Sequence, residues 1–293
     1  MPVIYSSVNV DERYSDGFAP VLYDKSWLLP GITCNDEYQK NGAAGGYYVR
    51  KLNISDNNEP TAPGDDFNDK NSGAALLQIV LNNAYTESER IPEAVAANIA
   101  SDIGQARLEA NVRVIRQRSE RSAISCLYNE GTLSPVEDIT RENVEEVLLG
   151  ERQKVSEENG EANVMLLHPD VYTKLMLSAG KNFTPNINEK ITSTGRVGDW
   201  FGFKVFEVSA FANSRSVPYV YNNYAGDPKT VSAADVRKIK FMMYDWQTFS
   251  SLINLSMYRL KDSERFNGVL AQCEAVRGFR VVEPKIVRVG VTA

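Results

Sequence analysis

The chain has 293 residues, of which 43% are hydrophobic and 24% are charged, and its formal net charge is −6 at pH 7. This composition excludes a disordered protein, and the length suits one large domain or two of ordinary size. The negative charge argues against a protein that mainly grips phosphate backbones, and no apolar run approaches the ~20 residues of a membrane-spanning helix, so we expect a cytosolic protein.

The first 90 residues contain polar segments with no core of their own. Residues 1–40 show little periodicity, so we expect an arm that lies on something else. Residues 47–53 and 75–85 suit two strands. The segment between them, SDNNEPTAPGDDFNDKNSG, is too polar to bury itself. The pattern therefore predicts a long two-stranded loop, and such loops are usually functional.

The longest helical signal in the chain follows this loop. It opens with Pro92 and Glu93, which suit a first helical turn, and runs to about residue 128. Two apolar strips lie on nearly opposite sides of it. The first strip is Val95, Ile99, Ile103, Ala106, Ala110 and Val114, and the second is Leu108, Val112 and Ile115. A helix of ~30 residues is ~45 Å long, too long for one small core, so we expect it to touch several elements or several subunits.

The rest of the chain alternates between helical and strand patterns. Thr140 is a candidate cap for a helix over residues 141–155, and Ile139 and Val144 have the spacing of a hydrophobic staple. Further strands are expected over residues 163–167, from Phe201 to Val205 and beyond, and over 217–223, 238–246, 252–260 and 279–291, with helices over 169–180 and 261–278. The order of these elements indicates an α+β protein.

The patterns of the common ligand sites are missing from the sequence. Three glycines fit neither a dinucleotide fingerprint nor a phosphate-binding loop, and we interpret them as turn residues: Gly195, Gly198 and Gly202. The acidic loop around Asp65, Asp66 and Asp69 fails the calcium-loop pattern, because Lys70 falls where an oxygen ligand is needed. We interpret that loop as solvated.

The cysteines and one set of arginines also have ordinary interpretations. The cysteines are odd in number and lack a CxxC spacing, so we expect buried thiols instead of a disulfide or zinc site: Cys34, Cys126 and Cys273. Three arginines share one face of the long helix, where a solvated or ion-paired face is favoured over a nucleic-acid contact: Arg107, Arg118 and Arg121.

His168, the single histidine, could be a general base, a metal ligand, or the junction between two elements. It lies between the predicted strand NVMLL and Pro169, which suits the first position of a helix. Because no second ligand or acid partner stands at a recognisable spacing, we favour the junction. We therefore predict no catalytic residue, no cofactor and no metal site, and we expect the protein not to be an enzyme.

Three segments together resemble the major capsid proteins of tailed bacteriophages, the Hong-Kong-97-type fold. NVMLLHPDVYTKLMLSAG is similar to the strand, turn and helix of that family's axial domain, and GDWFGFKVFEVSAF is similar to the segment that follows it. LKDSERFNGVLAQCEAVRGFRVVEPKIVRVGV resembles the closing part of the peripheral domain. The resemblance covers nearly the whole chain in the order of its elements, although His168 stands where a small polar capping residue is expected.

The resemblance implies a domain division and a role. Residues 1–40 would be the N-terminal arm, 41–91 the extended loop, 92–135 with 252–293 the peripheral domain containing the spine helix, and 136–251 the axial domain. The implied activity is self-assembly into pentamers and hexamers that close into an icosahedral head around double-stranded DNA. Weak non-specific contact with that DNA is expected, and scaffolding, portal and decoration proteins are further possible partners.

The implied location is the virion capsid, assembled in the host cytoplasm without any membrane. No N-terminal propeptide is expected to be removed.

Two alternatives stay open at this stage. The first is the shell of an encapsulin-type nanocompartment, which resembles the same fold but encloses cargo enzymes. The second is a cytosolic α+β enzyme with an unrecognised site.

Overall fold

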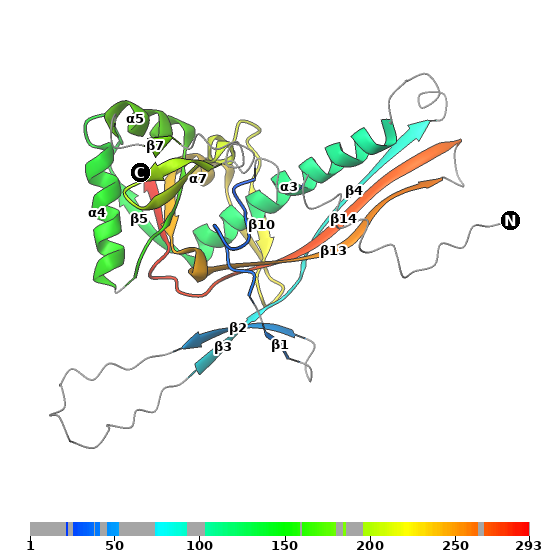
Figure 1. The fold of residues 1–293 in the computed structure, drawn as a ribbon, viewed down its shortest axis with the longest axis horizontal. Coiled ribbons are helices and arrows are strands. Elements are labelled where there is room, and N and C mark those ends of the chain that lie inside the picture. Colours follow the sequence, from blue (N-terminus) through cyan, green and yellow to red (C-terminus); the bar gives the residue numbers. More distant parts are fainter. Residues whose placement is uncertain are drawn as a thin grey trace, which may run out of the picture.

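The computed structural model describes residues 22, 26–37, 39–41, 46–52, 74–92, 103–158, 160–179, 184–185, 196–262 and 267–292. These residues form the predicted α+β fold, drawn out along one direction (Figure 1). A body of helices and strands occupies one end, a long helix with three long strands runs away from it, and a small sheet stands apart below. No helix among the described residues is long and apolar enough to cross a membrane.

The body is built on a seven-stranded sheet. In spatial order its strands are β5 (Thr132–Val136), β15 (Arg288–Thr292), β12 (Ile239–Tyr244), β6 (Val164–Leu167), β9 (Phe203–Glu207), β8 (Arg196–Trp200) and β7 (Thr184–Pro185). The pairs β5–β15 and β6–β9 are parallel, and the other pairs are antiparallel. β6 lies at the centre of this sheet, and all four of its residues are buried, as predicted for NVMLL.

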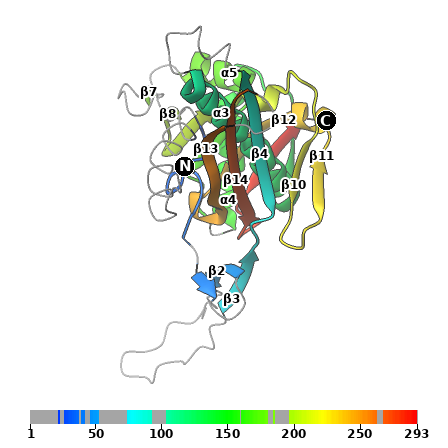
Figure 2. The same cartoon turned by 90° about the vertical axis from the view of Figure 1, so that its right-hand side faces the viewer.

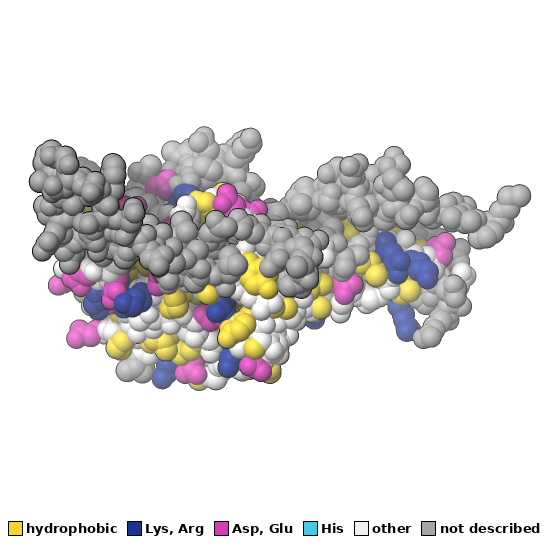
Figure 3. Space-filling model, turned by 90° about the horizontal axis from the view of Figure 1, so that it is seen from below, with side chains coloured by type: hydrophobic (Ala, Val, Ile, Leu, Met, Phe, Trp, Pro, Cys, Tyr) yellow, Lys and Arg dark blue, Asp and Glu magenta, His cyan; other side chains and the backbone are white. Residues whose placement is uncertain are grey.

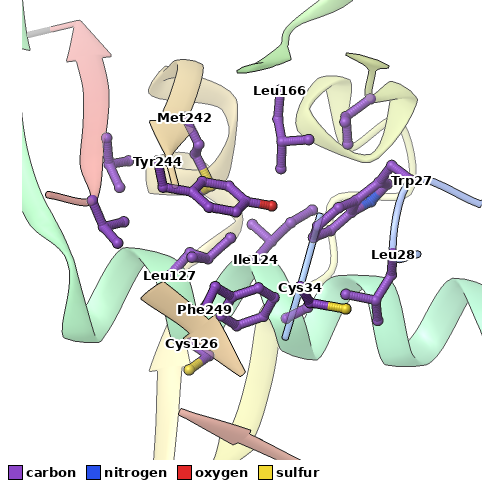
Figure 4. Close-up of a cluster of buried hydrophobic side chains, with 14 of the residues drawn as sticks. Trp27, Leu28, Cys34, Ile124, Cys126, Leu127, Leu166, Met242, Tyr244 and Phe249 are labelled. Atoms are coloured by element: carbon purple, nitrogen blue, oxygen red, sulfur yellow. The ribbon is translucent and has the colours of Figure 1, made fainter. Parts of the chain in front are cut away.

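Helices cover both faces of this sheet. Alternate residues of a strand point to opposite faces. On one face, Val164 and Leu166 join a core with Ile124 and Leu127 of α3 (Ile103–Glu130), part of which Figure 4 shows. On the other face, the intervening residues of β6 pack in a core with α4 (Val144–Glu157) and α5 (Pro169–Ala179). Smaller elements complete the body: α7 (Ala233–Lys238), two short 3-10 helices (Ser209–Ala212 and Trp246–Thr248), and the hairpin of β10 (Tyr219–Asn222) and β11 (Pro228–Val231).

The long helix α3 is confirmed, but its start and its buried face differ from the prediction. Pro92 ends strand β4 (Asn83–Pro92), where it pairs with Gly268, so it does not open the helix. The second predicted strip, Leu108, Val112 and Ile115, is buried, whereas Ala106, Ala110 and Val114 of the first strip are exposed. The reason is that a single sheet packs on α3 here and covers one side only. Val95 and Ile99 lie outside the described residues.

That sheet contains the largest error of the sequence analysis. Its strands, in the order β13 (Phe249–Asp262), β14 (Gly268–Val281) and β4, are antiparallel. The helix predicted over 261–278 is therefore wrong, because most of it is strand β14. Ala271, Cys273 and Ala275 are buried at every second position in one core with α3, which is the period of a strand. The predicted terminal strand over 279–291 is likewise divided between β14 and β15.

The entry to α4 also differs from the prediction. The helix begins at Val144, and Thr140 does not cap it. Instead, the backbone N–H of Thr140 donates to Oδ1 of Asn143 at 2.7 Å in the turn before the helix. Ile139 and Val144 are both buried in the core under α4, but they do not form the predicted staple, because the cap lies at Asn143 and Val144 is the first residue of the helix. Past α5, Phe201 is a turn residue with φ of 45° and is not part of a strand.

Part of the predicted arm packs into its own subunit. Trp27, Leu28 and Cys34 lie in the core beside α3 (Figure 4). The Ser26 hydroxyl donates to Glu120 of α3 at 2.7 Å, and burial raises the pKa of that carboxyl, an effect opposed by Ser26 and Arg116. This part of the predicted arm therefore lies on the core of its own chain.

Candidate assembly site at the root of the extended loop

The predicted two-stranded loop is present as a small sheet that stands away from the body (Figures 1 and 2). β2 (Gly46–Leu52) and β3 (Ala74–Ile79) pair antiparallel, and β1 (Gln39–Asn41) adds a third strand beside β2. The return strand predicted over 75–85 is divided, because β3 ends at Ile79 and β4 begins at Asn83 in a different sheet. Residues 80–82, here called the linker, therefore join the loop to the body.

Apolar packing fixes the base of the loop. Ile79 is fully buried and packs with Leu252 of β13. Three partly buried side chains surround this pair: Tyr47, Leu81 and Val282. The last residue of the loop sheet is thereby anchored to the long sheet of the body.

A glycine allows a close approach at the same point. A Cβ atom added to Gly278 of β14 would lie 2.7 Å from the carbonyl oxygen of Val80 and 2.9 Å from Cγ2 of Ile79. The first of these atoms belongs to the backbone, so a side chain at position 278 would force the linker to move. Glycine is required here for space.

Four asparagines, which we call the asparagine clasp, tie the end of the linker and the first residue of β4 to the β10–β11 hairpin: Asn82, Asn83, Asn222 and Asn223. The side chain of Asn83 accepts from the backbone N–H of Asn222 at 2.7 Å and donates to its carbonyl oxygen at 3.2 Å. Asn222 Nδ2 donates to the Asn82 carbonyl oxygen at 3.0 Å, and Asn82 Nδ2 donates to that of Asn223 at 2.5 Å. These bonds join segments about 140 positions apart in the sequence.

His168 is the junction that the sequence predicts. Its backbone N–H donates to the Lys240 carbonyl oxygen at 2.9 Å, and its Nδ1 accepts from the backbone N–H of Asp170 at 3.1 Å, as a helix cap does. Burial, helped by the charge of Lys240, lowers the pKa of this imidazole. The neutral form that can accept a hydrogen bond is therefore favoured.

The cap can be tested by replacing His168 with asparagine, a better capping residue. We expect His168→Asn to be neutral or to stabilise the subunit by up to ~1 kcal/mol at pH 7, measured by chemical denaturation. Because the folded pKa lies below the reference value of 6.5, acid favours the unfolded wild type, which binds more protons. The wild type should therefore lose more stability than the variant as pH falls from 7 to 5. Equal losses in both proteins would contradict the capping role.

The other residues singled out in the sequence do not come together as a site. All three cysteines are buried and free, as predicted, and burial raises the pKa of Cys34 and of Cys273 to about 12. The ion-paired interpretation holds for two of the arginines: Arg107 lies 3.1 Å from Glu89, and Arg118 lies 2.5 Å from Glu87. The third, Arg121, lies over the ring of Tyr219.

The glycine interpretation is confirmed at Gly202, which has φ of 83° in the β8–β9 turn, but not at Gly198, which lies within β8. Gly195 and the acidic residues Asp65, Asp66 and Asp69 lie outside the described residues. Within the described part of the chain, no group of three or more His, Cys, Asp or Glu could hold a metal ion. The feature that the described residues do build is a protruding loop sheet anchored at its base.

No family model and no curated protein sequence matches this chain. Solved structures do. A structure from Gordonia phage Cozz is 12% identical, with a TM-score of 0.59 over 94% of this chain and 86% of the other. The capsid structure of cyanophage P-SCSP1u is 12% identical, with a TM-score of 0.58 over 92% and 87%. The chain has the fold of tailed-phage major capsid proteins. A virus-like particle from Pyrococcus furiosus also matches, at 10% identity and a TM-score of 0.54 over 95% and 97%.

The asparagine clasp of this capsid fold was missed in the sequence analysis. Its one local signal is the Asn-Asn dipeptide, which occurs at 82–83 and again at 222–223. Nothing in either dipeptide indicates that it pairs with the other. The Gly278 contact was missed for the same reason, since it depends on which strand lies beside the linker.

Proposed function

We propose that this chain is the shell-forming subunit of a phage head, assembling into pentamers and hexamers that close around double-stranded DNA. The observation that carries the proposal is the likeness to solved phage structures over 92% to 94% of the chain, together with a small sheet that stands away from the body. This sheet has three strands, which is the least that an independently stable sheet needs, and such a sheet also needs a hydrophobic face or other packing. A second copy of the chain is the partner that a shell supplies.

The charge distribution suits loose contact with packaged DNA. Figure 3 shows Lys and Arg interspersed with Asp and Glu on the described part of the face seen from below. Ion pairs such as Arg107 with Glu89 and Arg118 with Glu87 neutralise part of the basic surface of α3. A shell protein with a net charge of −6 is expected to touch DNA weakly and non-specifically. Scaffolding, portal and decoration proteins, assembly in the host cytoplasm and the four-part domain division stay predictions.

Sedimentation of the purified protein tests the proposal. We expect large closed assemblies, and a monomer or dimer under all conditions would contradict the proposal and revive the enzyme alternative. The match to a virus-like particle keeps the nanocompartment shell as a second candidate. Particles purified from infected cells distinguish the two: nuclease-protected long double-stranded DNA supports the phage head, and an enclosed protein without DNA supports the nanocompartment.

A further inference from the structure

The asparagine clasp holds the linker, the short segment that joins the loop sheet to the long sheet of the body. The linker is only three residues long, and it joins two sheets that share no strand. On the side of β3, the direction in which the loop sheet leaves the body therefore depends on the backbone of residues 80–82; on the side of β1, Asn35 is bonded to β13. Apolar packing at Ile79 holds the position of this point, but non-directional contacts constrain its angle weakly.

Directional bonds supply the missing constraint. The side-chain Oδ1 of Asn83 accepts from the backbone N–H of Asn222, and its Nδ2 donates to the Asn222 carbonyl oxygen, so the side chain pairs with this backbone as a neighbouring strand would. Its Nδ2 also lies 3.3 Å from the Arg277 carbonyl oxygen, so the same amide reaches β14. Asn83 is only 6% exposed, so these bonds are shielded from competing water. Asn83, the first residue of β4, thereby ties the hairpin to the long sheet, and Asn82 ties the adjacent linker to the same hairpin.

The hairpin is in turn fixed on the long helix. The hydroxyls of Ser122 and Ser125 on α3 donate to the carbonyl oxygens of Val220 at 2.8 Å and Tyr219 at 3.1 Å. At the end of α3, Glu130 accepts from the Tyr221 hydroxyl at 2.9 Å. A continuous set of hydrogen bonds therefore runs from α3 through the hairpin to the linker.

We infer that the asparagine clasp sets the angle between the extended loop and the body, and with it the curvature of the assembled shell. The inference rests on the proposed function. β3 alone spans ~20 Å, so a rotation of about 10° at the linker moves its far end by ~3 Å. A displacement of that size changes how one subunit meets the next. Asn82 and Asn83 are thus positioning residues for assembly.

The experiment compares Asn82→Ala, Asn83→Ala and a matched control, Asn111→Ala. Asn111 is also buried, and its side chain joins α3 to β14 by one bond to the Ala271 carbonyl oxygen at 3.3 Å, but it is not part of the clasp. Two quantities are measured for each protein: the thermal midpoint of the free subunit, and the diameter distribution of assembled particles by electron microscopy.

We expect both clasp variants to give particles of broadened or shifted diameter, together with open sheets, whereas Asn111→Ala lowers the thermal midpoint and keeps the wild-type diameter. Asn82 is only partly buried, so we expect Asn82→Ala to disturb folding less than Asn83→Ala does. If Asn83→Ala proves unstable, Asn82→Ala still tests the effect of the clasp on particle diameter. Clasp variants with wild-type particle diameters would overturn the inference and leave the proposed function intact. Wild-type protein that forms no closed particles would overturn the proposed function itself.

Discussion

Removing the polar part of the extended loop should abolish shell assembly and leave the subunit folded. Leu52 and Ala74 are paired across β2 and β3, so deleting Ser55–Gly73 leaves Asn53 and Ile54 as a two-residue connection. Adding Ile54→Gly converts that connection to Asn-Gly, which suits a tight hairpin turn. Because the anchored root at Ile79 is untouched, we expect a thermal midpoint close to that of the wild type. Circular dichroism and sedimentation measure the two outcomes.

The shortened loop has its own control. A variant in which residues 55–73 are replaced by a Gly-Ser linker of the same length keeps the reach of the loop and removes its side chains. If both variants fail to assemble, the side chains of this segment make the contact. Assembly of the linker variant alone assigns the requirement to length. Wild-type shells from the deletion variant would show that this segment has no part in assembly.

The largest effect on folding is expected at Gly290 of β15, which lies between β5 and β12 in the seven-stranded sheet. Gly290 is paired with Phe241 of β12, and a Cβ atom at position 290 would lie 2.8 Å from Cδ1 of that ring and nearer still to Cε1 and Cζ. Phe241 is fully buried under α4 and α5, so the ring has little room to move. We expect Gly290→Ala to destabilise the subunit by ~1–3 kcal/mol, as overpacking does.

A second glycine of the body provides the matched control for this substitution. Gly150 lies in α4, and a Cβ atom at that position would meet nothing within 4 Å. Gly150→Ala should therefore stabilise the subunit by up to ~1 kcal/mol through helix propensity alone. Denaturant unfolding of the two variants should give shifts of opposite sign. A neutral Gly290→Ala would mean that β15 does not lie against Phe241.

Local patterns predicted the central part of the fold well. The run NVMLL is continuously apolar, as in a strand that is covered on both faces. Pro169, directly after His168, suits the first position of a helix. Each of these patterns depends on only a few neighbouring residues. The structure has β6 and α5 at these positions. The extended loop was recognised for a similar reason, because a segment so polar cannot be buried whatever surrounds it.

Features that depend on distant pairing could not be predicted from the sequence. Residues 261–278 include two Ala, two Glu, one Gln and one Leu, which are residue types that favour helices, and only pairing with β13 and β4 makes most of this segment a strand. The sequence does not indicate which of the two apolar strips of α3 is buried, because that depends on the side on which the sheet packs. The clasp requires Asn82 and Asn83 to meet residues about 140 positions away.

Electron microscopy of the purified protein shows whether the chain forms a shell through its extended loop. We expect closed particles of uniform diameter with icosahedral symmetry, in which β2 and β3 of each subunit lie against a neighbouring copy. A reconstruction at the level of secondary structure would show that contact at the expected place. Monodisperse single subunits over the full range of concentration and salt, with β2 and β3 uncovered, would contradict it.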